Sequence, residues 1–298
     1  MTTSNQMVQQ KMPFSVAVNT PSMQKLIANA LHDPARCARF TASIVSAVSV
    51  NQALQNCDRN TVISGALLGE SLNLSPSPQL GQYYLVPFNN KKKGMQDAQF
   101  VLGYKGYVQL ALRSGQYKSI NVEIVKQGEY KGRDPMTGDP RFQFLEDDDE
   151  WERLPVIGYM ASFEYLNGFR KVMYWSKEKM MNYADRYSAA FSRKAYENLI
   201  AGNIPQGEMW KYSSFWYKDF DSMAKKTMLR QLISKWGIMS TDMQSAYESD
   251  SRVIEETESG QLVPQVEEEP PQQIEEPQAA AQIPAQPAEP KQIDLSSL

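Results

Sequence analysis

The stretch QYYLVPFNNKKKGMQDAQFVLGYKGYVQLALRSGQYKSINVEIVKQGEYKGR occupies residues 82–133. Apolar runs at 83–88 and 100–102 flank a polar loop, and such runs bounded by Asn and Gly predict β-strands. Helical spacing at 108–113 predicts a short helix, and the run at 120–125 predicts a third strand. With the hairpin described below, we expect an α+β fold: a small antiparallel sheet with a long hairpin, packed by several helices.

The same stretch carries an excess of positive charge. Between residues 91 and 133 there are three acids and nine bases: Lys91, Lys92, Lys93, Lys105, Arg113, Lys118, Lys126, Lys131 and Arg133. Tyr104 and Tyr107 flank one of the lysines, Lys105. Cationic side chains interleaved with tyrosines suit a nucleic-acid-binding surface, in which the charged groups contact phosphates and the aromatic rings stack on bases. For each single ring, packing in the core is the competing role.

These residues resemble the RecT family of phage and prophage single-strand annealing proteins. The resemblance covers residues 21–236 and rests on the order and spacing of several motifs. These are Leu72-Asn73-Leu74 before a Pro-containing turn, Gly81 entering Tyr84-Leu85-Val86-Pro87-Phe88, Gly103-Tyr104-Lys105-Gly106, Ala111-Leu112-Arg113-Ser114-Gly115, and Ala224-Lys225-Lys226-Thr227 with Arg230.

The resemblance implies a protein that is not an enzyme. It implies a basic groove that binds single-stranded DNA, pairing of complementary strands without ATP, and retention of the annealed duplex. It further implies homo-oligomeric rings or helical filaments, a partner exonuclease, a host single-strand-binding protein, and a place in the bacterial cytoplasm. No cofactor is expected, although magnesium is left open as a modulator of DNA binding.

A second basic cluster lies in the region 209–236, which we expect to be one aromatic-rich helix with Phe215 facing inward. Residues spaced by seven lie near one face of a helix, so the cluster predicts a stripe of charge. The competing interpretation is a solvated face, and the resemblance favours a phosphate track. The predicted DNA-binding residues of both clusters are Lys91, Lys92, Lys93, Tyr104, Lys105, Tyr107, Arg113, Lys118, Lys126, Lys211, Lys218, Lys225, Lys226 and Arg230.

Charge also divides the chain into two parts. From Asp250 onward there are eleven acids and two bases, out of 34 and 31 in all, which leaves 23 acids and 29 bases before it. The first part is therefore basic and the last part acidic, a division typical of nucleic-acid-binding proteins with acidic tails. A basic excess of this size also fits a merely soluble protein, so the clustering is the better evidence.

We expect three regions along the chain: a flexible arm at 1–19, one domain at 20–247 and a disordered acidic tail at 248–298. The last region has no Phe, Tyr or Trp and holds seven of the seventeen prolines, so it has little apolar area to bury. Removing residues 250–298 should then leave the domain folded. The end of the tail, 292–298, regains apolar spacing and is either a docking peptide or an ordinary terminus.

Local signals predict several elements within the domain. Thr20-Pro21 and Asp33-Pro34 start helices, the second running through Leu54, and 60–72 predicts another. Asn167-Gly168 between the runs 156–166 and 169–175 predicts a hairpin. Ser176 caps a helix reaching Arg186, whereas 128–154 and 198–207 read as loops.

The sequence lacks the motifs of several classes of binding site and targeting segment. None of the sixteen glycines precedes a lysine, which excludes a P-loop of the usual form. One histidine and two cysteines do not make an ordinary zinc site, and no membrane-spanning or signal segment is visible. Two alternatives stay open: a passive single-strand-binding protein, and a magnesium-dependent nuclease using the acidic run Glu146–Glu150.

Overall fold

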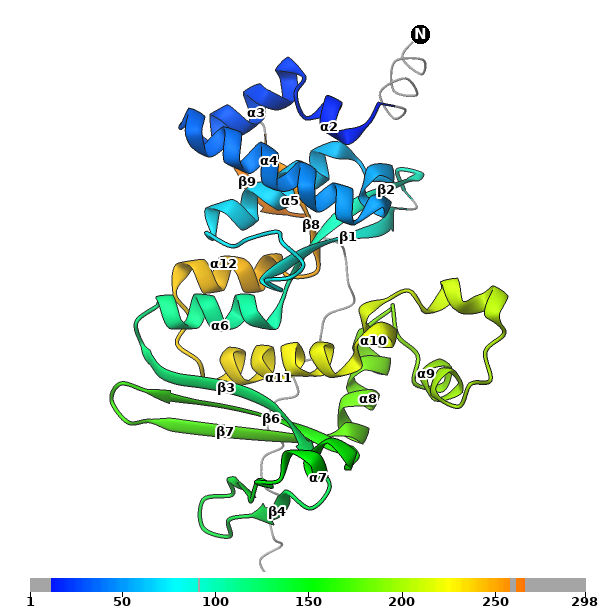
Figure 1. The fold of residues 1–298 in the computed structure, drawn as a ribbon. Helices are drawn as coiled ribbons and strands as arrows, with labels where there is room; N and C mark the ends of the chain where they lie inside the picture. The colour runs from blue at the N-terminus through cyan, green and yellow to red at the C-terminus, as the bar shows by residue number, and fades with distance from the viewer. Residues whose placement is uncertain (1–11, 91, 258–260, 266–298) are drawn as a thin grey trace, which may run out of the picture. The chain divides into compact units, whose positions relative to one another are not determined.

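The computed structural model describes residues 12–90, 92–257 and 261–265, which belong to one compact unit ending at Gln265 (Figure 1). Helices and antiparallel strands are both present, so the predicted α+β class is confirmed. Lys91, most of the predicted arm and most of the predicted tail, with its apolar end, lie outside the described residues.

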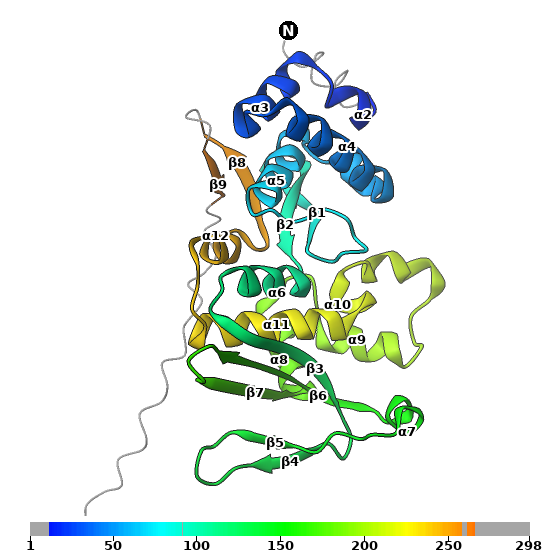
Figure 2. The same ribbon diagram turned by 60° about the vertical axis from the view of Figure 1, so that its left-hand side comes forward.

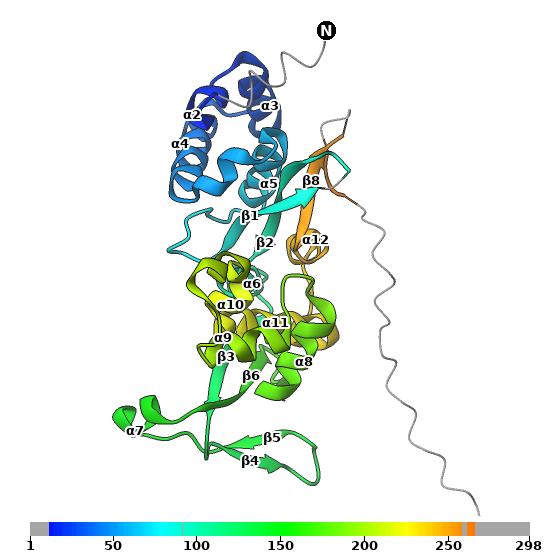
Figure 3. The same ribbon diagram turned by 90° about the vertical axis from the view of Figure 1, so that its right-hand side faces the viewer.

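One sheet contains the hairpin at the centre of the sequence. Strand β1 (Tyr83–Asn90) pairs with β2 (Met95–Leu102), and β2 then pairs with β8 (Arg252–Glu256). Strand β9 (Leu262–Pro264) completes the order β1-β2-β8-β9. Figure 3 shows β8 alongside the hairpin, although the two are far apart in sequence.

The remaining strands form two further sheets rather than extending the first. Strand β6 (Val156–Tyr165) lies between β3 (Tyr117–Lys126) and β7 (Arg170–Ser176), while β4 (Tyr130–Arg133) and β5 (Pro140–Phe142) form a ribbon. The β6–β7 hairpin is the predicted one, and its alternating residues are all buried: Tyr159, Ala161, Phe163 and Tyr165.

The turn of that hairpin is longer than two residues. Of the Asn-Gly pair only Gly168 has a positive φ, of 86°, and Asn167 instead accepts a hydrogen bond from the amide of Phe169.

From residue 12 on, where the structure is described, four α-helices precede β1. They are α2 (Phe14–Ala17), α3 (Pro21–Leu31), α4 (Pro34–Val50) and α5 (Arg59–Ser71), with a 3₁₀ turn η1 (Gln52–Asn56) before the last. Asp33 caps α4 by accepting from the amide of Ala35, as its position before Pro34 predicts. Phe14 and Val18 are buried, so the arm predicted at 1–19 is wrong for its second half.

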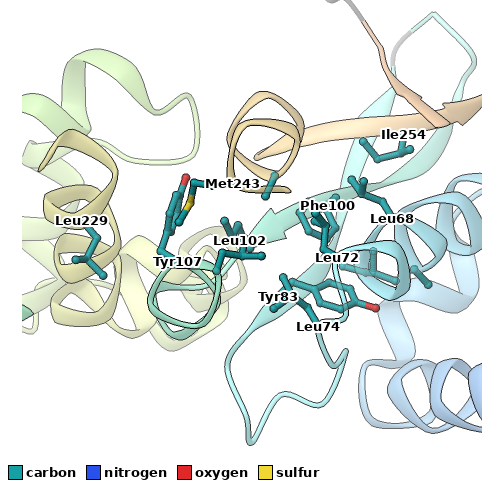
Figure 4. Packing of buried hydrophobic residues seen from close by; sticks show 14 of the residues in the cluster. Leu68, Leu72, Leu74, Tyr83, Phe100, Leu102, Tyr107, Leu229, Met243 and Ile254 are labelled. Atoms are coloured by element: carbon teal, nitrogen blue, oxygen red, sulfur yellow. The ribbon is translucent and has the colours of Figure 1, made fainter. Parts of the chain in front are cut away.

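Helix α5 is the centre of one core. An unbroken run from Thr61 to Gly69 is buried, because α3 and α4 lie against one side of the helix and β2 and β8 against the other. Figure 4 shows Leu68 and Leu72 of this helix region near Phe100 and Ile254 of the sheet.

The later helices pack around the β3-β6-β7 sheet and against each other. They are α6 (Tyr104–Arg113), α7 (Asp148–Arg153), α8 (Lys177–Tyr187), α9 (Arg193–Ile200), α10 (Phe215–Lys218), α11 (Phe220–Trp236) and α12 (Thr241–Ser249), with η2 (Gln206–Tyr212) before α10. Helix α6 lies against α11, and α11 against β6 (Figure 1). Among the described residues no helix is long and apolar enough to cross a membrane.

Three predictions about this half were wrong. The region 209–236 is not one helix, because the chain leaves helical geometry at Ser214 and again at Asp219, which caps α11 through the amide of Ser222. The regions 128–154 and 198–207, read as loops, contain β4, β5, α7 and the end of α9. Short elements such as these lack the periodicity that reveals longer ones.

The predicted boundary at 247 was also wrong. Helix α12 ends at Ser249 and the chain continues into β8 (Figure 2). Asp250, Val253 and Ile254 are buried. Two aliphatic side chains on a strand that pairs with an existing sheet bury enough apolar surface to hold the segment without any aromatic residue. The folded unit therefore extends to Gln265.

Candidate nucleic-acid interface

The motif Gly103-Tyr104-Lys105-Gly106 marks a close contact between two stretches of backbone. A Cβ atom on Gly103 would lie 2.1 Å from the carbonyl oxygen of Gly81, and one on Gly106 would lie 2.1 Å from that of Gln82. The amide of Gly103 donates to the Gln82 carbonyl at 2.8 Å, and Gly81 has a φ of 62°. Only glycine fits these positions, and the contact fixes the start of α6 against the entrance of β1.

This contact brings rings and lysines together from four elements. The Lys225 Nζ of α11 lies 5.1 Å from the ring centroid of Tyr104 on α6. On β1, the Tyr84 ring lies 5.3 Å from the ring of Phe215 on α10, and Lys105 is exposed beside Gly81. We name the set Tyr84, Tyr104, Lys105, Phe215 and Lys225 the aromatic–lysine surface.

The Tyr84 hydroxyl lies in a partly buried setting. Burial raises its pKa above the ordinary value of 10.0, and the neighbouring Tyr104 and Asp219 raise it further. Tyr84 and Tyr104 are half-buried and Phe215 is 42% exposed, so their rings are held by packing while part of each surface faces solvent. Ring faces with ammonium groups beside them can stack on bases and contact the phosphates between them.

A second group of predicted residues is not at the surface. Tyr107 is fully buried (Figure 4), and its hydroxyl donates to Asp250 Oδ2 at 3.2 Å. The same carboxylate pairs with Lys226 Nζ at 2.8 Å and with Arg230 at 3.3 Å, and accepts from the amide of Leu102 at 2.9 Å. We name Asp250 with Tyr107, Lys226 and Arg230 the Asp250 network.

The burial of this network changes its protonation chemistry. Burial lowers the pKa of Lys226, although the Asp250 carboxylate acts in the opposite direction. Burial also opposes the charge of Arg230, but Tyr107 and Asp250 outweigh it and raise the pKa of the guanidinium. Tyr107 and Lys226 were therefore wrongly predicted to meet DNA, and Arg230 is held by Asp250 and by the ring of Tyr247.

Lys126 was wrongly predicted as well. Its ammonium is buried, donates to the Leu154 carbonyl at 2.7 Å and lies 4.7 Å from the centroid of the Trp151 ring. Beneath it the buried Glu129 accepts from the Lys126 amide and from Trp151 Nε1. These contacts attach the end of β3 to α7 and leave the lysine no free donor surface for a phosphate.

Three other predicted lysines are exposed but have acidic partners. Lys93 lies 3.0 Å from Glu255 and 3.5 Å from the buried Asp97; the pairs Lys118–Glu164 and Lys211–Glu208 are 2.6 and 3.0 Å long. Arg113 donates to the carbonyls of Asn73 and Gln109. Lys92, Lys105 and Lys218 are exposed and form no ion pair with any described residue. As DNA contacts, all seven stay predictions.

The acidic run has a local role. Asp147 caps α7 by accepting from the amide of Glu150, and the acids that follow form the first turn, where the helix dipole favours negative charge. Within the described ranges no three His, Cys, Asp or Glu side chains are placed to hold a metal ion. The nuclease alternative stays a hypothesis.

Sequence reasoning missed three residues of these sites. Tyr84 was recognised only as one of two alternating tyrosines, of which Tyr83 is indeed the buried one. Phe215 was expected inside but is exposed, whereas the next residue of α10, Trp216, is buried. Asp250 carried no local signal at all.

Comparison with known proteins agrees with the motifs. The chain is 39% identical over 228 residues to the uncharacterized protein YqaK of Bacillus subtilis (strain 168), covering 76% of this chain and 67% of that one. It is 35% identical over 114 residues to Protein RecT of Escherichia coli (strain K12), covering 38% of this chain and 42% of RecT. The RecT family model matches residues 38–266, a span that contains both the aromatic–lysine surface and the Asp250 network, and the chain belongs to the RecT family.

Proposed function

We propose that this protein binds single-stranded DNA and anneals complementary strands in phage-type recombination, without hydrolysing a nucleotide. The observation that carries the proposal is the aromatic–lysine surface, at the family motif Gly103–Gly106. Base pairing supplies the free energy of annealing, while the protein neutralises phosphates and holds bases on rings, each worth about 1–3 kcal/mol of stacking.

The finer features of the proposal follow from the family. The protein acts as rings or helical filaments of identical subunits in the cytoplasm of a bacterial host and retains the annealed duplex. An exonuclease supplies its single strands, and the host single-strand-binding protein is a second partner. No cofactor takes part.

Annealing itself tests the proposal. Two complementary oligonucleotides are mixed with and without the full chain, and pairing is followed by fluorescence quenching. We expect the chain to accelerate pairing, and the double variant Tyr104→Ala with Lys225→Ala to lose most of that acceleration.

A matched control removes another ring–cation pair. Tyr187 is 40% exposed and has the Arg186 guanidinium 5.2 Å from its ring centroid, so Tyr187→Ala with Arg186→Ala removes the same kinds of group elsewhere. Equal losses in both double variants would place the DNA away from the aromatic–lysine surface. Binding without acceleration would identify a passive single-strand-binding protein.

A further inference from the structure

The Asp250 network and the aromatic–lysine surface share the same two helices. On α6, Tyr104 belongs to the surface and Tyr107, one turn later, to the network. On α11, Lys225 belongs to the surface and its neighbour Lys226 to the network. One carboxylate therefore contacts both helices directly beside the residues that would meet DNA.

We propose that Asp250 is a positioning residue of the nucleic-acid surface: it sets the placement of α6 relative to α11, so that Tyr104 and Lys225 meet. The inference rests on the proposed function, because it assigns a role in DNA binding to a residue that touches no DNA. It also gives the short segment between α12 and β8 a part in the site.

The carboxylate is itself fixed from both sides. Asp250 follows α12 directly, and the next residue, Ser251, donates its amide to the Phe100 carbonyl of β2 at 2.7 Å. The amide of Leu102, two residues before α6, donates to the carboxylate. The hydrogen bonds to β2 thus fix the position of the Asp250 carboxylate, and α6 and α11 are placed by their contacts with that carboxylate.

The buried ammonium of Lys226 makes the position of α11 depend on the charge of Asp250. Its side chain is only 8% exposed, and a buried ammonium without a counterion must either lose its proton or move toward water. Moving toward water displaces α11 at the position next to Lys225. If Lys226 loses its proton, the ionic attraction between α11 and residue 250, which also contacts Tyr107 of α6, is lost.

A double-mutant cycle separates positioning from general stabilisation. The affinity of a fluorescent oligonucleotide is measured for the full chain, for D250N, for Tyr104→Ala and for the pair, at a temperature where circular dichroism shows all four folded. The D250N side chain keeps one oxygen, which can accept from the Leu102 amide, and places an NH2 group opposite the Tyr107 hydroxyl, which can accept from it; the charge is removed.

We expect Tyr104→Ala to weaken binding about tenfold in the native background, as the loss of one stacked base predicts. In the D250N background the same change should weaken binding less than threefold, because the ring is already misplaced. The control cycle pairs D250N with Lys92→Ala on the β1–β2 loop, and there the two effects should multiply.

Each result has one meaning. Multiplying effects of D250N and Tyr104→Ala would overturn the inference and leave the proposed function standing. No effect of Tyr104→Ala in the native background would overturn the inference and place the DNA away from the aromatic–lysine surface, whereas failure of the native chain to bind the oligonucleotide would overturn the proposed function. If D250N does not fold, Tyr107→Phe replaces it, since this change removes only the hydroxyl that joins α6 to the carboxylate, and the same threefold limit applies.

Discussion

Asp250 and Lys226 form an ion pair of 2.8 Å in which the carboxylate side chain is fully buried and the lysine side chain 8% exposed. The pair moves one member of a basic stripe from the surface into the interior. Burial opposes the charge of such a lysine and the Asp250 carboxylate offsets that cost, so the ammonium is paired inside the fold and does not face a ligand.

Removing Asp250 should destabilise the protein strongly. D250A leaves Lys226 and Arg230 without their common counterion, and breaking a buried pair from one side costs about 3–5 kcal/mol. Urea unfolding followed by tryptophan fluorescence measures this loss. Lys25→Ala, at an exposed lysine on α3, is the control and should change stability by less than about 0.5 kcal/mol. Equal stability of D250A and the native chain would mean that the pair is not formed in solution.

Two glycines should not tolerate a methyl group. Gly103→Ala and Gly106→Ala each place a Cβ atom 2.1 Å from a backbone carbonyl oxygen, and a shift of α6 that relieves this costs about 3 kcal/mol or more. The matched control is Gly207→Ala, where nothing lies within 4 Å of the added atom. Thermal melts should show a large loss for the first two variants and none for the third.

Cys57 should be inert in the folded protein. Burial, followed by the nearby Asp97 and Asp58, raises the pKa of its thiol from 9.0 to about 12. A raised pKa stabilises the fold below pH 9, and this contribution is lost as the pH rises toward 12. Alkylation with iodoacetamide at pH 8, analysed by mass spectrometry, should modify the half-buried Cys37 well before Cys57. Equal rates at the two cysteines would contradict the burial of Cys57.

Truncation should depend sharply on where the chain is cut. A chain ending at Gln265 keeps every described residue, whereas one ending at Ser249 loses Asp250 and β8, so the expectation that residues 250–298 are dispensable is replaced. Removing 266–298 takes away seven acids and one base, which should maintain or increase DNA affinity. Melting curves and oligonucleotide titrations of both truncations check this. A cooperative melt of the shorter chain near the native temperature would refute the role of β8.

Salt dependence should identify the phosphate contacts. Each phosphate of a single strand that is neutralised contributes about 0.7 to the slope of log affinity against log salt. Replacing Lys92, Lys105 and Lys218 with alanine should lower the slope by about 2. The control replaces Lys25, Arg39 and Lys194, which are also exposed and form no ion pair with a described residue. An equal change of slope in both triple variants would mean that net charge, not location, sets the affinity.

The predictable parts of the fold are those with local signals. Asp33 before Pro34 caps its helix, Ser176 caps α8, and Asn167-Gly168 lies in the turn of its hairpin, because each signal acts within a few residues. The break at Asp219 was missed since apolar spacing continues through it. The Asp219 side chain, which caps the following helix, decides the break.

The site was predicted less well than the fold. Lys225 and Lys226 are neighbours with the same charge, yet one faces Tyr104 and the other Asp250. Helix α11 is buried on several sides, including Thr227, Met228 and Leu229 in succession, so its sequence has no single polar face from which to tell the two lysines apart. Lys226 is buried because it pairs with the carboxylate of Asp250, which lies 24 residues further along the sequence. No periodic pattern of the sequence relates two residues so far apart.

The position of β8 in the sequence also bears on how the chain folds as it is synthesised. Helix α5 and strand β2 are made early, but their partner β8 and the carboxylate of Asp250 emerge only after α11 and α12. Until then Lys226 has no counterion and the edge of β2 is unpaired, a state prone to association with other chains. Closure of the fold by its last long-range pairing makes folding slow relative to a chain of local contacts.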